Sequence, residues 1–215
     1  MSLQYILFDL DDTLYPRDTP IMYDIGECIK TFMMNTLGIT YEEAAQRRDR
    51  YNAKYGTVVR GLLQEEAVDV DAYLEFVHDI PVTKYLEPNP QLAKMLAEIP
   101  LRKFIFTNSY RTHAHNVMTA LGVADQFEGV FDIKSVDYVS KPARYPYSVV
   151  INKLNTIPKT CIYIDDKVIN LKEPYMLGMR TILIDDEPNE WVDVKLDNIL
   201  EIGNIVQKML AKETR

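Results

Sequence analysis

The sequence of 215 residues is poor in cysteine and in clustered positive charge. Its two cysteines, Cys28 and Cys161, lie in unrelated contexts, so neither a disulfide framework nor a Cys-x-x-Cys site is available. It has 24 Lys and Arg residues against 32 Asp and Glu residues, a net charge of −8, and no basic run. Because sequence-independent binding of DNA or RNA depends on Lys and Arg that neutralise phosphates, a polymeric nucleic acid is not expected as a partner.

Long apolar runs are also absent from the sequence. No run approaches the roughly 18 residues needed to span a bilayer, and Met1 leads straight into apolar residues without a charged region or a cleavage site. These features predict a protein without a membrane partner, located in the cytoplasm, whose reducing conditions fit the cysteine usage. With 47% hydrophobic and 26% charged residues, the chain has an average globular composition and the length of one or two domains. The oligomeric state does not follow from the composition.

Short apolar runs recur along the sequence and are typical of buried parallel strands. They cover residues 5–8, 103–106, 129–133, 161–164 and 181–184, and the third of them is the weakest. Each run is followed by a helical pattern, and this alternation predicts an α/β fold with an open parallel sheet. Such a sheet binds its ligands at the carboxyl ends of its strands, so the residues directly after each run are the candidate site.

About ninety residues between the first and second runs do not form strand and helix units. Apolar residues recur at helical spacing in the first part of this region, and residues 41–51 and 69–77 continue the helical pattern. We therefore predict a helical insertion over residues 16–87, placed as a cap on a core formed by residues 1–15 and 88–215.

Acidic pairs follow the first and fourth apolar runs. Asp9 and Asp11 are two residues apart, so in an extended backbone their side chains share one face at about 7 Å. Two close carboxylates repel each other unless a cation lies between them or one keeps a proton. An ionised Asp9 could attack phosphorus, and a partly protonated Asp11 could protonate the leaving oxygen. Asp165 and Asp166 would complete an oxygen-rich site for Mg²⁺, although helix caps and solvated turns are the structural alternatives.

Two further segments could bind a phosphoryl group. Thr107 and Asn108 precede a helix expected to begin at Ser109, where a hydroxyl and unpaired N–H groups form a phosphate site. Lys141 precedes Pro142, which favours an extended backbone and could aim a fixed cation at the phosphoryl group. A plain helix cap and a solvated lysine are the alternatives.

Several other polar residues are left out of the predicted site. His113 and His115 cannot ligate one ion together, because residues two apart lie about 200° apart around a helix. Asp12, Ser109 and Arg111 are expected to act as caps or surface contacts.

A third acidic pair, Asp185 and Asp186, also follows a strand. The residues after it indicate an acidic surface loop. Adding this pair to the predicted site would also give more negative charge than one Mg²⁺ can neutralise. Asn170 is instead expected to hold the loop of Asp165 by side-chain hydrogen bonds.

The ordered candidate set resembles the four motifs of the haloacid dehalogenase superfamily of phosphohydrolases. The residues that carry the resemblance are Asp9-Leu10-Asp11-Asp12-Thr13, Thr107-Asn108, Lys141-Pro142 and Asp165-Asp166. The resemblance implies a Rossmann-like parallel-sheet core with a helical C1-type cap inserted after the first strand. It places the nucleophile on Asp9 and the general acid and base on Asp11, with Thr107 and Lys141 on the phosphoryl oxygens. It also implies that Mg²⁺ is held by Asp9, the backbone carbonyl of Asp11 and Asp165, with Asp166 as a ligand or a water-holding residue.

Within that superfamily, residues 51–62 and 107–114 resemble the pyrimidine 5'-nucleotidase branch, whose members also hydrolyse other small phosphomonoesters. The expected function is Mg²⁺-dependent hydrolysis of nucleoside 5'-monophosphates or other small phosphorylated metabolites through an aspartyl-phosphate. A phosphomutase or phosphotransferase of the same fold is the alternative, and a phospho-accepting signalling module is a more distant one. A haloalkanoate dehalogenase would not need Asp11 or Asp165, and these two residues argue against it.

Overall fold

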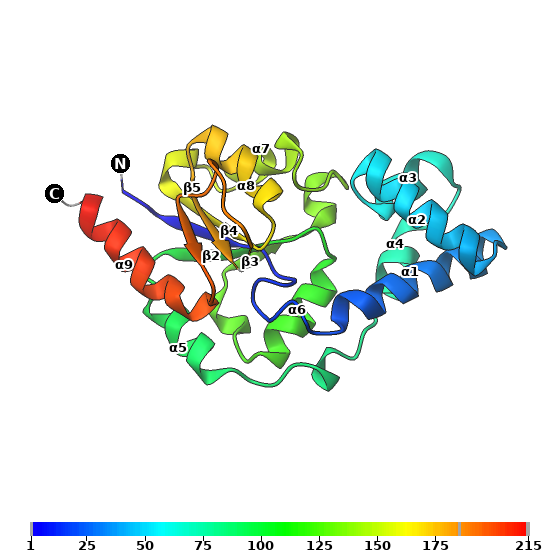
Figure 1. Cartoon of the computed structure of the whole chain (residues 1–215), viewed down its shortest axis with the longest axis horizontal. Coiled ribbons are helices and arrows are strands. Elements are labelled where there is room, and N and C mark those ends of the chain that lie inside the picture. Colours follow the sequence, from blue (N-terminus) through cyan, green and yellow to red (C-terminus); the bar gives the residue numbers. More distant parts are fainter. Residues whose placement is uncertain (1, 185, 214–215) are drawn as a thin grey trace.

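Six parallel strands form one sheet in the order β3-β2-β1-β4-β5-β6, with β1 at its centre (Figure 1). The computed structural model describes residues 2–184 and 186–213. The strands are β1 (Tyr5–Phe8), β2 (Arg102–Phe106), β3 (Gly129–Phe131), β4 (Cys161–Asp165), β5 (Arg180–Ile184) and β6 (Val194–Leu196). The α/β class and the parallel sheet predicted from the sequence are confirmed.

Alternate residues of the strands supply the cores on the two faces of the sheet. Ile6 and Phe8 of β1 pack on one face, whereas Tyr5 and Leu7 pack on the other. Because all four are buried, the strand is a continuous apolar run without a polar face. This is why β1 could be recognised to the residue.

Helices cover both faces of the sheet. Side chains of α5 (Pro90–Glu98), α6 (Arg111–Ala120) and α9 (Ile202–Glu213) share one core with the sheet. Side chains of α7 (Arg144–Lys153) and α8 (Val168–Leu177) share the core on the opposite face. The result is a three-layer α/β/α core.

A helical lobe lies at the end of the molecule opposite the chain termini (Figure 1). It consists of α1 (Ile21–Leu37), α2 (Tyr41–Tyr55), α3 (Val58–Glu65) and α4 (Val70–Val77). Side chains from all four helices form its own apolar core. The sequence indicated helical structure here but did not separate α3 from its neighbours. The division into a cap at 16–87 and a core remains a prediction.

Local hydrogen bonds fix where the helices of the lobe begin. Thr40 and Glu43 form a capping box at the start of α2, and the side chains of Thr57 and Asp69 accept backbone N–H groups at the starts of α3 and α4. Short polar side chains at these positions satisfy N–H donors that have no partner within the helix. The three starts are therefore specified locally.

Gly61 of α3 lies directly against the ring of Tyr51 of α2. A Cβ atom at Gly61 would approach Tyr51 Cγ to 2.2 Å. We expect Gly61→Ala to lower the free energy of unfolding by about 1–3 kcal/mol, because the ring is buried and cannot move aside without strain. Gly26→Ala is the matched control in α1, since a Cβ there would meet only the flexible end of Arg48 at 3.3 Å. Thermal unfolding should show a decrease for Gly61→Ala and no decrease for Gly26→Ala, and equal melting temperatures would contradict this packing.

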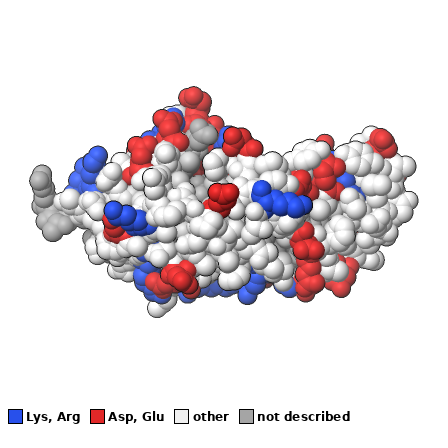
Figure 2. Space-filling model, turned by 90° about the horizontal axis from the view of Figure 1, so that it is seen from below, with Lys and Arg blue, Asp and Glu red and all other residues white. Residues whose placement is uncertain are grey.

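Charged side chains of both signs are interspersed over the surface seen in Figure 2. On that face Lys and Arg occur in small groups among Asp and Glu. Within residues 2–184 and 186–213, no helix combines the length and apolar character needed to cross a bilayer.

Candidate active site

The carboxyl ends of β1 and β4 bring the predicted acids together. The two strands are neighbours, with Phe8 opposite Ile164, and Asp9 N–H donates to the Ile164 carbonyl at 2.8 Å. Asp165 ends β4, so its carboxyl lies beside that of Asp9 at the same edge of the sheet. The topology thus joins residues that are more than 150 positions apart in the sequence.

Lys141 connects these acids from the loop before α7. Its Nζ donates to Asp9 Oδ1 at 2.7 Å and to Asp165 Oδ2 at 3.1 Å. Nζ also donates to the Phe106 carbonyl and to the Tyr163 hydroxyl at 2.9 and 2.8 Å. With 3% of its surface exposed, Lys141 is a buried and fixed cation and not the solvated surface lysine considered as its alternative.

Three buried carboxylates form a group suited to a divalent cation. Asp9, Asp165 and Asp166 each offer an oxygen within 4.8 Å of the others. Burial raises the pKa of Asp9 against the opposing charge of Lys141, and burial followed by the charge of Asp165 raises the pKa of Asp166. Asp166 Oδ1 is buried and has no hydrogen-bond partner. Carboxylate oxygens are what Mg²⁺ prefers, so this donor set fits the ion implied by the sequence.

Neighbouring groups hold the Asp165 carboxylate in place. The Asn170 amide donates to Asp165 Oδ1 and Oδ2 at 2.9 and 3.0 Å, which confirms the hydrogen bonds expected for Asn170. The Lys167 backbone N–H donates to Oδ1 at 2.9 Å, and the Tyr163 hydroxyl donates to Oδ2. The carboxylate is therefore oriented by Lys141, by its own strand and by the residues that follow it, up to the first turn of α8.

The Asp11 carboxylate has partners that the sequence did not indicate. It accepts hydrogen bonds from Ser109 and Tyr15 at 2.6 Å and from His113 at 2.7 Å. Burial would raise the pKa of Asp11, but the charge and hydrogen bond of His113, with the two hydroxyl bonds, outweigh it and hold this pKa below its usual range. These contacts favour the ionised form of Asp11, and its partial protonation stays a prediction.

The segment after β2 also differs in detail from the prediction. α6 begins at Arg111 and not at Ser109, and the Ser109 hydroxyl turns to Asp11 and is neither a cap nor a surface contact. Arg111 is a surface residue, as expected: its side chain is 60% exposed and forms an ion pair with Asp132.

Thr107 and Asn108 shape the strand end next to Lys141. Thr107 Oγ1 accepts the Ser109 backbone N–H at 3.0 Å. The Asn108 side chain pairs with the Lys141 backbone in both directions, at 2.9 Å to its N–H and 3.2 Å to its carbonyl. The Asn108 amide thus holds the loop that carries Lys141.

A cavity of about 250 Å³ lies over this site. The predicted catalytic and phosphate-binding residues that line it are Asp9, Asp11, Thr107, Asn108 and Lys141. Met22 and Gly56, which come from the helical lobe, line it too, so the lobe forms part of its wall. The structure therefore brings the predicted set into one pocket, with Asp165 and Asp166 buried beside it.

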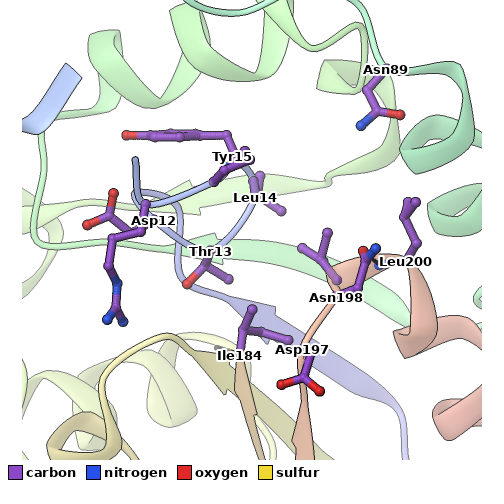
Figure 3. Close-up of a pocket in the computed structure, with 12 residues that line it drawn as sticks. Asp12, Thr13, Leu14, Tyr15, Asn89, Ile184, Asp197, Asn198 and Leu200 are labelled. Carbon is purple, nitrogen blue, oxygen red and sulfur yellow. Dashed lines mark hydrogen bonds between the residues drawn. The ribbon is translucent and has the colours of Figure 1, made fainter. Parts of the chain in front are cut away.

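A second cavity of about 330 Å³ is lined by the loop after β1 and by residues at the ends of β5 and β6 (Figure 3). Its polar lining includes Asp12, Asn89, Asp197 and Asn198, whereas Asp9 and Lys141 do not reach it. Without the buried cation and the clustered acids it offers no comparable chemistry.

Asp186 is the described member of the third acidic pair. Asp185 falls outside the described residues. Asp186 accepts the Glu187 backbone N–H and does not belong to the carboxylate group of Asp9, Asp165 and Asp166.

Comparison with known proteins places the chain among hydrolases. The family model for haloacid dehalogenase-like hydrolases matches residues 3–172. The chain is 28% identical over 191 residues to Phosphate metabolism protein 8 of Saccharomyces cerevisiae, covering 82% of this chain and 60% of that protein. It is 24% identical over 224 aligned positions to the Glyceraldehyde 3-phosphate phosphatase of Methanocaldococcus jannaschii, covering 95% and 97% of the two chains.

A solved structure shares the fold over nearly the whole chain. The HAD phosphatase from Thermococcus onnurineus superposes with a TM-score of 0.65 at 18% identity, covering 95% of this chain and 98% of that one. At this identity the likeness concerns the fold.

Proposed function

This chain belongs to the haloacid dehalogenase-like hydrolase family, and we propose that it is a Mg²⁺-dependent phosphomonoester hydrolase that forms an aspartyl-phosphate on Asp9. The observation that carries the proposal is the buried group of Asp9, Asp165 and Asp166, in which Lys141 pairs with Asp9 and Asp165, next to a pocket lined by Asp9 and Lys141. The phosphatases named among its relatives support the enzyme class expected from the sequence.

Asp9 is the nucleophile in this proposal. A carboxylate oxygen of Asp9 forms a bond to phosphorus while the bond from phosphorus to the leaving oxygen breaks. Lys141 holds Asp9 at 2.7 Å and carries a fixed positive charge toward the phosphoryl oxygens, with the Thr107 hydroxyl on the same wall of the pocket. Water then attacks the aspartyl-phosphate and releases inorganic phosphate.

Asp11 serves the proton transfers of both steps. In this proposal Asp11 carries a proton when the substrate is bound, gives it to the leaving oxygen in the first step, and takes one back from the attacking water in the second. Its carboxylate lines the same pocket as Asp9. When bound between Asp9, Asp165 and Asp166, Mg²⁺ would neutralise charge on the phosphoryl oxygens and on the acids.

The substrate is proposed to be a small phosphorylated metabolite, with nucleoside 5'-monophosphates as the first class to test. The pocket is small and is partly walled by Met22 and Gly56 of the helical lobe. We propose that residues 16–87 act as a cap that selects the leaving group over the catalytic core of residues 1–15 and 88–215. The cytoplasmic location stays a prediction.

A phosphate-release screen tests this function directly. With Mg²⁺ present, the protein is expected to release phosphate from nucleoside monophosphates, sugar phosphates, glyceraldehyde 3-phosphate or pyridoxal phosphate, in equal amount to the substrate consumed. Excess EDTA should abolish the release, and added Mg²⁺ should restore it. Full activity in EDTA would contradict the metal. Consumption of substrate with transfer of the phosphoryl group to a second hydroxyl would indicate a mutase, and a stable phosphoprotein without turnover would indicate a signalling module.

A further inference from the structure

Three donors converge on the Asp11 carboxylate, one from the loop after β1 and two from α6 and the segment that leads into it. The Tyr15 hydroxyl and His113 Nε2 contact Oδ1, and the Ser109 hydroxyl contacts Oδ2. All three residues are buried, with exposed fractions of 3%, 0% and 8%. We call Tyr15, Ser109 and His113 the Asp11 clamp.

The orientation of His113 is fixed from both sides. Its Nε2–H donates to the carboxylate, whereas Nδ1 is buried without a partner. The ring of His78 packs against it with 5.4 Å between ring centroids. His78 is held in turn, because its Nδ1–H donates to the Leu74 carbonyl of α4 at 2.8 Å. Helix α4 of the lobe therefore supports His113 through the ring of His78.

Tyr15 approaches Asp11 from the loop after β1. In Figure 3 its ring extends away from Asn89 and Asn198, two other residues that line the second cavity. Its hydroxyl reaches Asp11 Oδ1 at 2.6 Å. Hydroxyl groups both donate and accept, so Tyr15 and Ser109 can keep their contacts whether the carboxyl group carries a proton or not.

We propose that the Asp11 clamp is a set of positioning residues that aims Asp11 at the leaving oxygen, and that His113 is the member tied to the helical lobe through His78. The proposal rests on the function proposed above, because it assigns a role to Asp11 partners in that reaction. It also gives the lobe a part in orienting Asp11, in addition to forming the pocket wall.

The clamp should matter most for substrates that need a proton in the first step. An alkyl leaving group departs as a strong base unless it is protonated as the bond to phosphorus breaks. An aryl leaving group such as p-nitrophenolate is a weak base and departs with little assistance. A misdirected Asp11 therefore slows alkyl phosphates more than aryl phosphates, whereas general damage to the fold slows both alike.

The test compares kcat for glycerol 2-phosphate and p-nitrophenyl phosphate in Mg²⁺. We expect His113→Leu to lower kcat for the alkyl phosphate by on the order of 10-fold or more relative to the aryl phosphate, with KM values little changed. His113→Gln, which keeps a donor near the position of Nε2, should recover much of this loss. His115→Leu is the matched control, because His115 is exposed on the same helix.

Tyr15→Phe removes one clamp hydrogen bond with almost no change of shape and should show the same selective loss. If His113→Leu does not fold, Tyr15→Phe still tests the role of the clamp. Equal losses on both substrates, or no loss in Tyr15→Phe, would overturn the clamp. Failure of the proposed function would look different, since the unaltered protein would then release phosphate from neither substrate.

Discussion

Asp9→Asn is expected to lower kcat by on the order of 10⁴- to 10⁶-fold, the scale seen when a covalent nucleophile is removed. The amide keeps the shape of the side chain, and its oxygen can still accept the hydrogen bond from Lys141 Nζ. It also removes one negative charge from a group of three buried acids. The protein should therefore stay folded, with a melting temperature equal to or above that of the unaltered chain.

Phosphate release under saturating substrate and Mg²⁺ measures this effect, with thermal unfolding recorded on the same samples. Asp186→Asn makes the same chemical change at the end of another strand, outside the carboxylate group, and should leave kcat within about twofold. If the kcat of Asp9→Asn were close to that of Asp186→Asn, Asp9 would not be the nucleophile. Loss of activity together with loss of folding would leave the nucleophile assignment unsupported and would contradict the expected stability.

The sequence predicted five of the six strands and the acids at the edge of the sheet. A strand buried on both faces is a short apolar run, and the acid that follows it must lie at the carboxyl edge of a parallel sheet. This reasoning identifies β1 and predicts that Asp9 and Asp165 lie together. It failed for β6, which has three residues and keeps Lys195 exposed, so no continuous apolar run marks it.

The partners of Asp11 could not be predicted because they depend on packing between elements. His113 and Ser109 reach Asp11 only because α6 packs on the same face of the sheet as the loop after β1. Spacing within the sequence excluded a joint metal site for His113 and His115, but it carried no information about a carboxylate about one hundred residues away. The contact between Tyr163 and Asp165 is different, because residues two apart in β4 have their side chains on the same face of the sheet.

The tyrosines of the lobe show that the burial of a side chain also cannot be predicted from its residue type alone. Aromatic residues in a helical region are more often core residues than surface ones, and this favours core positions for Tyr41, Tyr51, Tyr55 and Tyr73. Tyr51 and Tyr73 are buried in the core of the lobe, but Tyr41 is 44% exposed and binds Lys30 and Glu27 at the surface. A tyrosine side chain is suited both to a buried and to an exposed position, because it has an apolar ring and a polar end.

Lys141→Ala is expected to reduce both activity and stability. Removing the fixed cation should lower kcat/KM by on the order of 10²- to 10³-fold, as for other donors that stabilise charge in the transition state. The change also leaves Asp9 and Asp165 without their shared partner at 2.7 and 3.1 Å. Because these acids are buried, unfolding free energy should fall by about 3–5 kcal/mol in the absence of metal. Lys208→Ala, an exposed lysine of α9, should change neither quantity.

Magnesium separates the two effects of Lys141→Ala. An ion bound among the acids supplies positive charge to them, and at about 100 times its Kd it should restore roughly 2.7 kcal/mol of stability. It should not restore turnover to the same extent, because the variant still lacks the charge that Lys141 directs at the phosphoryl group. Thermal unfolding and phosphate release are therefore to be measured across a Mg²⁺ titration. If Mg²⁺ raised the melting temperature of Lys208→Ala but left that of Lys141→Ala unchanged, the lysine itself and not the carboxylates would be required to hold the ion, and the division of roles proposed for this site would be wrong.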